Sequence, residues 1–144
     1  MAIFNGTDLL LKVSPSDGAS TLKLMHSQTC SLSINVDTID ISTKDSAGNR
    51  TLIAGQKSFS LSADGLMDFA GVAGDTEPDE IFTQMITNRT AVTFTFGFDS
   101  PATGEYSYSG SGIVTSMEMS GAMEDAPTYS VTIEGTGALT QTVA

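Results

Sequence analysis

Tryptophan is absent from this chain of 144 residues, which holds a single cysteine, Cys30, and a single histidine, His26. One cysteine excludes an internal disulfide and a metal site built from several cysteines. One histidine excludes a histidine-rich metal site, and the chain lacks the G-x-S-x-G turn of a hydrolase nucleophile. We interpret His26 as a surface or edge-strand residue. Cys30 lies in the apolar phase of its segment, and we interpret it as an unreactive core residue.

Basic side chains are scarce too. The chain has 6 lysines and arginines against 17 aspartates and glutamates, a net charge of -11, and no basic residue follows Arg89. Proteins that hold nucleic acids do so with clustered lysines and arginines. A surface with this excess of acid repels DNA. We therefore expect no specific binding of nucleic acid.

Long hydrophobic runs and familiar catalytic motifs are missing as well. No apolar stretch approaches the roughly 20 residues of a membrane-spanning helix, so we expect no membrane span and no secretory signal. No P-loop, dinucleotide-binding or EF-hand motif occurs, although Asp64, Asp68 and Asp75 leave a weak calcium site open. We assign no catalytic, cofactor-binding or metal-binding residues. We expect that the protein is not an enzyme and needs no cofactor.

What the chain does contain is a repeated alternation of apolar and hydroxyl side chains, supplied by 37 serines and threonines. A period of two residues predicts β-strands with one apolar and one polar face. Phe94 and Phe96 mark the clearest apolar phase, and Met117 and Met119 are interpreted as core residues of a later strand. The alternating segments are residues 9–13, 30–36, 58–63, 92–98, 106–119 and 129–133.

Two of these segments contain irregularities. The apolar positions change from even to odd numbers between Val36 and Ile39. This change predicts a bulge or bend near residues 37–38, or a simple loop between two strands. Gly110 and Gly112 interrupt a later strand and predict a bend or a close approach of two backbones.

One helix and one long loop complete the expected elements. Residues 77–88 carry acidic residues in their first turn and an apolar stripe that ends at Ile86, which predicts a helix packed against a sheet. Residues 43–56 are polar and irregular, apart from Leu52 and Ile53. A loop of this length in a compact domain is often functional. We expect it to reach a neighbouring copy of the chain and to become ordered there.

The order of strands, one helix and further strands predicts a mainly β fold. We expect an antiparallel β-sandwich or partly open barrel with one flanking α-helix at about residues 77–88. No linker composition interrupts the chain, and its length suits one domain. We therefore expect a single domain over residues 1–144, with a long loop at about residues 43–56.

Three stretches together resemble the major tail proteins, or tail tube proteins, of long-tailed bacteriophages and of phage-derived gene transfer agents. Residues 5–13, from Asn5 to Val13, resemble the opening strand of that family. Residues 31–65, from Ser31 to Gly65, resemble its strand, long loop and strand. Residues 114–118 and 129–139 resemble its closing hairpin. These pieces span nearly the whole chain in the order found in the family.

The resemblance implies a structural subunit of a phage tail tube. Such a subunit associates with itself into rings, expected to be hexamers, that stack around a channel for DNA passage into the host. The resemblance further implies contacts with the tape measure protein, the tail terminator and baseplate or distal tail proteins. It places the protein in the virion tail, after synthesis in the host cytoplasm. The family carries no catalytic motif, so no site residues follow from it.

Two alternatives remain open from the sequence. One is the tube protein of a related injection or secretion machine. The other is a carbohydrate-binding or adhesin β-sandwich, which would usually expose aromatic side chains for stacking on sugars. For a tube, we expect some of the polar strand faces to line the channel, either that of Ser58, Ser60 and Ser62 or a later set. The later set is Ser107, Ser109, Ser116, Glu118, Ser130, Thr132 and Glu134.

Overall fold

The computed structural model describes residues 6–13, 22–23, 27–67, 83, 86–87, 91–98 and 102–144. Short 3-10 helices occur at η1 (Gly6–Asp8) and η2 (Lys44–Ser46). The strands are β1 (Leu9–Val13), β2 (Leu22–Lys23), β3 (Ser27–Asp40), β4 (Leu52–Leu66), β5 (Val92–Phe98), β6 (Tyr106–Ser120) and β7 (Thr128–Val143).

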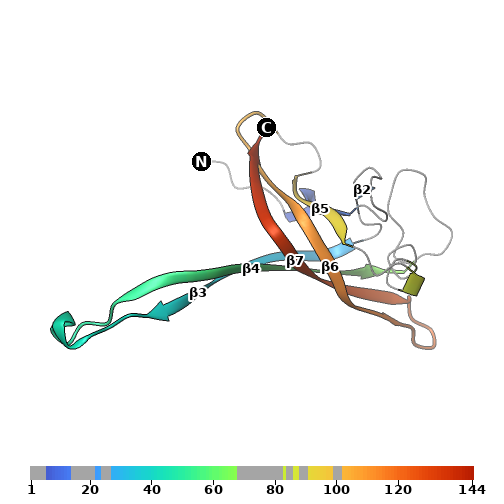
Figure 1. The fold of residues 1–144 in the computed structure, drawn as a ribbon. Helices are drawn as coiled ribbons and strands as arrows, with labels where there is room; N and C mark the ends of the chain where they lie inside the picture. The colour runs from blue at the N-terminus through green and yellow to red at the C-terminus, as the bar shows by residue number, and fades with distance from the viewer. Residues whose placement is uncertain are drawn as a thin grey trace.

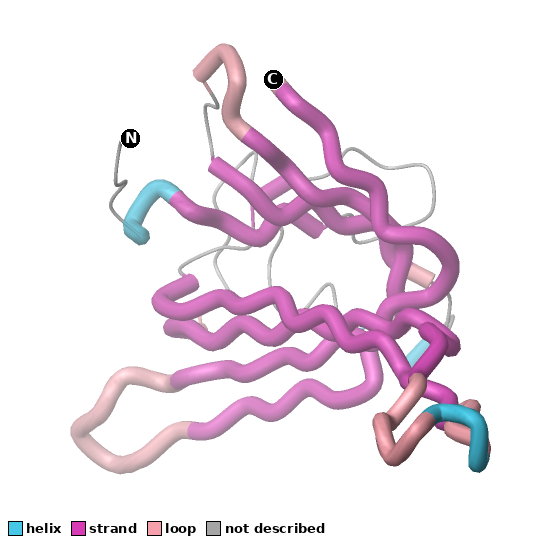
Figure 2. Tube along the Cα trace, turned by 90° about the vertical axis from the view of Figure 1, so that its left-hand side faces the viewer, coloured by secondary structure: helices cyan, strands magenta, loops and turns pink. Residues whose placement is uncertain are grey.

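These strands form one antiparallel sheet in the order β2-β1-β5-β6-β7-β4-β3. The sheet curls over itself, so that β1 and β5 lie above β3 and β4 while β6 and β7 run through both layers (Figures 1 and 2). β1 touches β3 without pairing with it, and the Cys30 thiol donates a hydrogen bond of 3.4 Å to the Leu9 carbonyl oxygen. The sheet is therefore not closed, and the prediction of a mainly β fold is confirmed.

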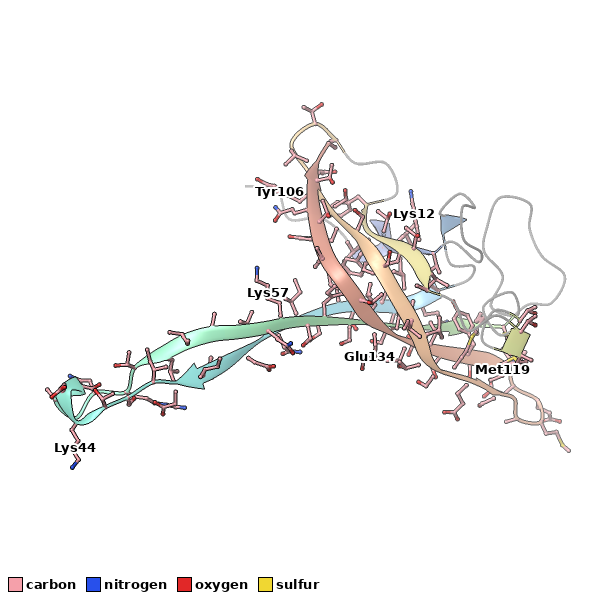
Figure 3. All side chains as sticks on the ribbon, viewed as in Figure 1. Lys12, Lys44, Lys57, Tyr106, Met119 and Glu134 are labelled. Carbon is pink, nitrogen blue, oxygen red and sulfur yellow. The ribbon has the colours of Figure 1, made fainter. Side chains whose placement is uncertain are left out.

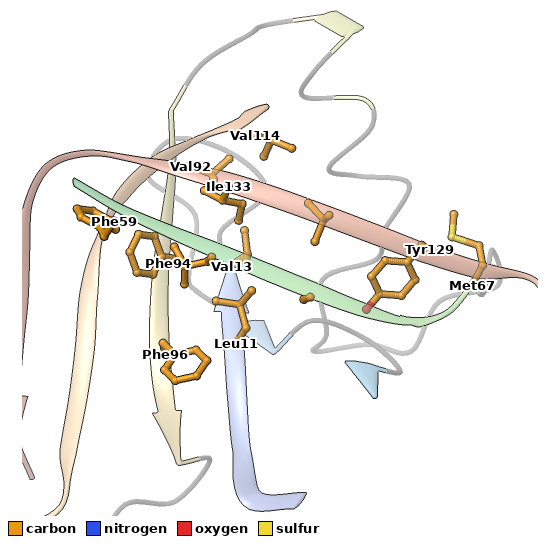
Figure 4. Packing of buried hydrophobic residues seen from close by; sticks show 13 residues of the cluster. Leu11, Val13, Phe59, Met67, Val92, Phe94, Phe96, Val114, Tyr129 and Ile133 are labelled. Atoms are coloured by element: carbon orange, nitrogen blue, oxygen red, sulfur yellow. The ribbon is translucent and has the colours of Figure 1, made fainter. Parts of the chain in front are cut away.

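The core lies between the two layers of the curled sheet (Figure 4). Phe94 and Ile133 are both 0% exposed, and the rings of Phe59 and Phe94 lie 5.7 Å apart. The predicted alternation of residues 92–98 and 129–133 is confirmed, because each second residue enters this core. The core consists of Leu11, Val13, Phe59, Leu61, Ala63, Met67, Val92, Phe94, Phe96, Val114, Tyr129, Val131 and Ile133.

The long strands β6 and β7 bend between the layers at paired glycines. Gly112 lies opposite Gly135 in the ladder, and the register shifts between Ser109 and Ser111 nearby. A Cβ atom at Gly112 would lie 2.9 Å from the Glu134 carbonyl oxygen, and one at Gly135 would collide with the Phe59 ring. The predicted close approach of backbones is confirmed, since no larger residue fits here.

Two expectations from the sequence need correction, and a third lies mostly outside the described residues. The predicted helix at residues 77–88 lies outside the described residues except for Thr83, Ile86 and Thr87, which are helical. Ile86 is 79% exposed, so its expected place on a packed stripe is wrong. Met117 packs against the core as predicted. Met119 points to the same side of β6, because it pairs with Tyr129, but it is 45% exposed, so its expected place in the core is wrong.

The loop expected at residues 43–56 is shorter than predicted. β4 begins at Leu52, so the connection between β3 and β4 covers only residues 41–51. Residues 52–56 had no alternating pattern to mark a strand. They form one because Ile53 pairs with Ile39, and Leu52 pairs with Asp40, across the ladder.

Candidate assembly surfaces

The polar side chains of β3, β4, β7 and β6 meet on one face of the sheet, opposite the core. Residues that lie directly across from each other in a ladder point to the same face. Ser31 pairs with Ser62, Ser62 with Thr132, and Thr132 with Ser116, which makes a row of hydroxyl groups across four strands. The hydroxyl oxygens of Ser31 and Ser62 are 2.6 Å apart.

Neighbouring rows extend this surface, which we call the hydroxyl face. Lys57 points to the core side of β4, whereas Glu134 lies on the opposite side (Figure 3). Among the described residues of the hydroxyl face, three are acidic and none is basic. The hydroxyl face comprises Ser31, Ser33, Ser60, Ser62, Asp64, Ser116, Glu118, Ser130, Thr132 and Glu134.

The structure thus joins the two polar sets that the sequence left as alternatives. The serines of β4 and the later set from Ser116 onward belong to one continuous face. Ser109 does not share it: through Thr95 it lies in the row of Lys12, on the outer surface of the other layer. Ser107 lies two residues before Ser109 on the same stretch of β6.

Both borders of the four-stranded part that carries the hydroxyl face are open strand edges. β3 is the last strand of the sheet, and its outer edge pairs with no strand in the described part of the chain. On the other side, β5 pairs with β6 only as far as Gly112, so one edge of residues 113–120 of β6 is open as far as the described residues go. Open edges present unpaired N–H and C=O groups and are templates for pairing with another chain. No signal in the sequence marks the second edge, because this edge depends on where the pairing of β6 with β5 ends.

The outer part of the β3–β4 hairpin projects far from the rest of the molecule (Figure 1). We call this segment, residues 37–56, the arm. Its apolar side chains are exposed on a ribbon of only two strands: Ile39 to 50%, Leu52 to 41% and Ile53 to 47%. Leu52 and Ile53, the apolar exceptions in the loop expected from the sequence, are thus poorly buried in a single copy.

The tip of the arm is held by its own hydrogen bonds. The Asp40 carboxylate accepts a bond of 2.8 Å from the Ser42 amide and lies 3.4 Å from the Arg50 guanidinium. Ser42 in turn accepts a bond of 2.7 Å from the Thr51 amide, and Thr43 begins η2 with a capping box. The tip therefore has hydrogen bonds of its own, and the expectation that it reaches a neighbouring copy and becomes ordered there stays a prediction.

These bonds set the protonation of Asp40. The hydrogen bonds from Ser42, first from its side chain and then from its backbone, lower the pKa of Asp40, and Arg50 adds to this effect. The carboxylate that organises the tip is thus held in its charged form.

Those residues considered earlier for chemistry that the structure describes do not form a reactive site. Cys30 is partly buried against the core, and this burial raises the pKa of its thiol. His26 lies outside the described residues, as do Asp68 and Asp75. In the described part of the chain no three histidine, cysteine, aspartate or glutamate side chains are grouped to hold a metal ion. Phe94 and Phe96 are core residues and offer no platform for a sugar.

No helix among the described residues combines the length and the apolar character that crossing a membrane requires.

A comparison with models of protein families identifies one family. Residues 3–141 match the family model described as phage tail tube protein. A search of curated proteins gave no match.

Solved structures of tails share the fold. A chain from the virion of a native gene transfer agent has 23% identity and a TM-score of 0.77, over 98% of this chain and 100% of that one. The tail of an empty gene transfer agent particle, refined with C6 symmetry, gives 23% identity and 0.78 over the same shares. The SPP1 tail tube protein gives 16% identity and 0.73, over 99% of this chain and 80% of that one. With the family match over nearly its whole length, the chain belongs to the phage tail tube proteins and is a structural subunit of a virion tail.

Proposed function

We propose that six copies of this chain close into a ring by pairing the open edge of β3 in one copy with the open edge of β6 in the next. The observation that carries this proposal is the continuous hydroxyl face, which lies on the four strands between those two edges. A contact between two different surfaces generates a ring when its rotation closes. Closure also removes both edges, as in a barrel. The C6 symmetry of the similar tail supports six copies.

In this arrangement the hydroxyl face lines the channel, and stacked rings conduct DNA. Each phosphate bound by a lysine or arginine adds binding free energy and would slow a passing polyanion. The hydroxyl face offers no such anchor among its described residues, and Asp64, Glu118 and Glu134 give it negative charge. The DNA is therefore in transit and is not specifically bound.

Reversing the charge of this face tests the proposal. Negative-stain microscopy of the purified chain is expected to show rings or tubes with a central hole. The double variant Glu118→Lys with Glu134→Lys should still form tubes but deliver DNA more slowly, and the delay should grow at low salt, where screening is weak.

The matched control is Glu124→Lys with Asp125→Lys. It makes the same change of charge in the β6–β7 connection, outside the hydroxyl face. Its DNA delivery should stay normal. Normal delivery by intact tubes of the Glu118 and Glu134 variant would refute the assignment of the lumen.

We also infer the partners that a tube of this kind needs at its ends and inside it. A stack of identical rings has no internal stop, so its length requires a tape measure protein in the channel and a terminator at one end. Baseplate or distal tail proteins meet the other end. The chain is made in the host cytoplasm before assembly. Because the family is structural, we infer no catalytic activity.

A related injection machine is the second candidate. The tube or sheath terminator of an extracellular contractile injection system shares the fold with a TM-score of 0.64 at 15% identity, over 99% of both chains. The same ring could serve such a machine without conducting DNA. Genes for a capsid and a tape measure protein beside this one would favour a phage tail.

A further inference from the structure

The connection between β6 and β7, residues 121–127, presents one large apolar side chain to solvent. Met123, at its turn, is 93% exposed. Hydrogen bonds hold the turn around it. The Asp125 amide donates to the Ala122 carbonyl oxygen over 3.3 Å, and the Ala126 amide donates to the Asp125 carboxylate over 2.9 Å. We call this connection the methionine tip.

The backbone of the methionine tip is strained next to Met123. Glu124 has a φ of 62°, in the left-handed region that glycine enters without strain and that other residues rarely adopt. Backbone strain of this kind persists at sites where it serves a function. An exposed methionine beside a strained residue does nothing for the stability of a single copy, so we searched the molecule for a surface that takes it.

A groove of about 300 Å³ lies at the other end of the four strands that carry the hydroxyl face. β4 pairs with β7 from Leu66 and Thr128, beside the methionine tip, only as far as Ser60 and Glu134. Beyond this last pair the two strands diverge and leave the edge of the core open between them (Figure 1). The lining of the groove is mostly apolar and includes Ile34, Lys57, Phe59, Tyr108, Leu139 and Gln141.

The register of β4 keeps this wall of the groove in line with the core. Between Val36 and Thr38, β3 advances by two residues while β4 advances by three. The bulge predicted near residues 37–38 therefore lies on the partner strand, at Gly55, just outside the groove. Lys57 precedes no such irregularity on its way to the core and points to the core side (Figure 3).

In the proposed ring, the methionine tip and the groove lie on opposite faces. The strands of a closed barrel tilt by roughly 35–45° from its axis, so each strand runs from one rim to the other. β7 runs from Thr128, beside the methionine tip, to Leu139 in the groove. When rings stack in one direction, the methionine tips of one ring therefore face the grooves of the next.

We propose that the methionine tip of a copy in one ring inserts into the groove of a copy in the next ring, with Met123 as its apolar anchor. This proposal rests on the proposed function, since it needs stacked rings. Methionine adapts to irregular gaps and makes favourable contacts between its sulfur and aromatic rings, and the groove offers Phe59 and Tyr108. The hydrogen-bonded turn lowers the entropic cost of docking, because it exists before contact.

Charge favours this occupant of the groove over a basic segment. The methionine tip carries Glu124 and Asp125, whereas the described lining of the groove contains Lys57 and no acidic residue. These charged side chains are all exposed. Exposed ion pairs direct the approach of two surfaces but add little affinity. We therefore assign the affinity to the burial of Met123 and the direction of approach to the charges.

An engineered disulfide tests which copies are in contact. The chain with Met123→Cys and Gln141→Cys is assembled into tubes, oxidised and separated on a denaturing gel without reductant. Each copy should link to one copy in the ring above and one in the ring below. The bands should therefore form a ladder that extends beyond the number of copies in one ring. Each single-cysteine variant is the control for the native Cys30 and should give no ladder.

The outcomes separate this proposal from the proposed function. A ladder that stops at the number of copies in one ring would show contact within the ring and would overturn the insertion between rings. No ladder from intact tubes would overturn it as well and would leave the tube in place. Failure of the parent chain to form rings or tubes would overturn both.

Substitutions of the anchor give a second measurement. Met123→Ser should leave rings intact and raise the concentration needed for their stacking by about tenfold or more, because an apolar side chain is no longer buried. Met123→Leu should stack like the parent chain. Glu124→Lys with Asp125→Lys keeps the anchor and should change this concentration by less than about fivefold. Normal stacking of the Met123→Ser variant would overturn the proposal.

Discussion

The two halves of the β3–β4 hairpin share one ladder but differ in what their apolar side chains touch. In the base, Phe59 and Leu61 are only 6% and 1% exposed. In the arm, Leu52 and Ile53 are 41% and 47% exposed. Burial of apolar surface is the main favourable term both in folding and in association. The base therefore stabilises the subunit, while the apolar side chains of the arm stay exposed in a single copy.

The difference follows from which layers lie over the hairpin. β1 and β5 cover the base, whereas the arm extends beyond both of them (Figure 1). An isolated two-stranded hairpin is only marginally stable in water. The arm keeps its shape through its continuity with the base and through the hydrogen bonds of Asp40 and Ser42 at the tip. Changes in the base should thus act on folding, and changes in the arm on assembly.

The largest effect on the stability of a single copy is expected from substitutions in the core that lies against the base of the hairpin. Phe94→Ala removes a fully buried ring that contacts Phe59. It should lower the free energy of unfolding by about 3–5 kcal/mol, because a cavity adds to the lost transfer energy. Urea denaturation of the monomer measures this loss. Thr93→Ala, at the exposed neighbouring position, is the control and should change the free energy by less than about 0.5 kcal/mol. Equal losses from both variants would contradict the described core.

A smaller effect on stability is expected from shortening the arm. Deleting residues 45–50 removes exposed side chains, so the free energy of unfolding should fall by less than about 1 kcal/mol. The variant should keep the circular dichroism spectrum of the monomer and lose tube formation. Replacing residues 45–50 by a glycine–serine segment of the same length removes the side chains of the tip but keeps the length of the arm. It therefore separates the effect of those side chains from the effect of arm length. If the deleted chain polymerises normally, the arm is not an assembly element.

The smallest effect concerns the protonation of Asp40. Its pKa is lowered in the folded chain below the ordinary value of 3.8. The contribution of Asp40 to the tip is therefore fully present above pH 3.8 and is lost as the pH falls through the folded pKa. A titration followed through the Ser42 amide in NMR should have its midpoint below 3.8.

Ser42→Ala is the matched variant for this titration, because Ser42 is the main cause of the shift. It should move the midpoint of Asp40, followed through the side-chain carboxyl carbon, upward. A midpoint at or above 3.8 in the parent chain would show that the tip is not organised around the charged carboxylate.

The sequence predicted the strands best where the alternation was long. Residues 92–98 and 129–133 enter the core as their pattern indicated, because an exposed face and a buried face demand different side chains. The prediction failed at residues 52–56 and at Met119. A strand exposed on both faces leaves no alternating pattern, and the exposure of Met119 depends on where the covering layer ends.

The sequence by itself determined the strands with a long alternation, the hydroxyl-rich alternate positions, the glycines at the bend and the resemblance to tail tube proteins. These features are local, because strand alternation and the space required by a side chain act over a few residues. Only the tertiary structure decided that the two polar sets form one face, that residues 113–120 of β6 have an open edge, and that the bulge lies at Gly55 rather than on β3. These features depend on the register between strands that are far apart in the chain, and a shift of one residue moves a side chain to the other face.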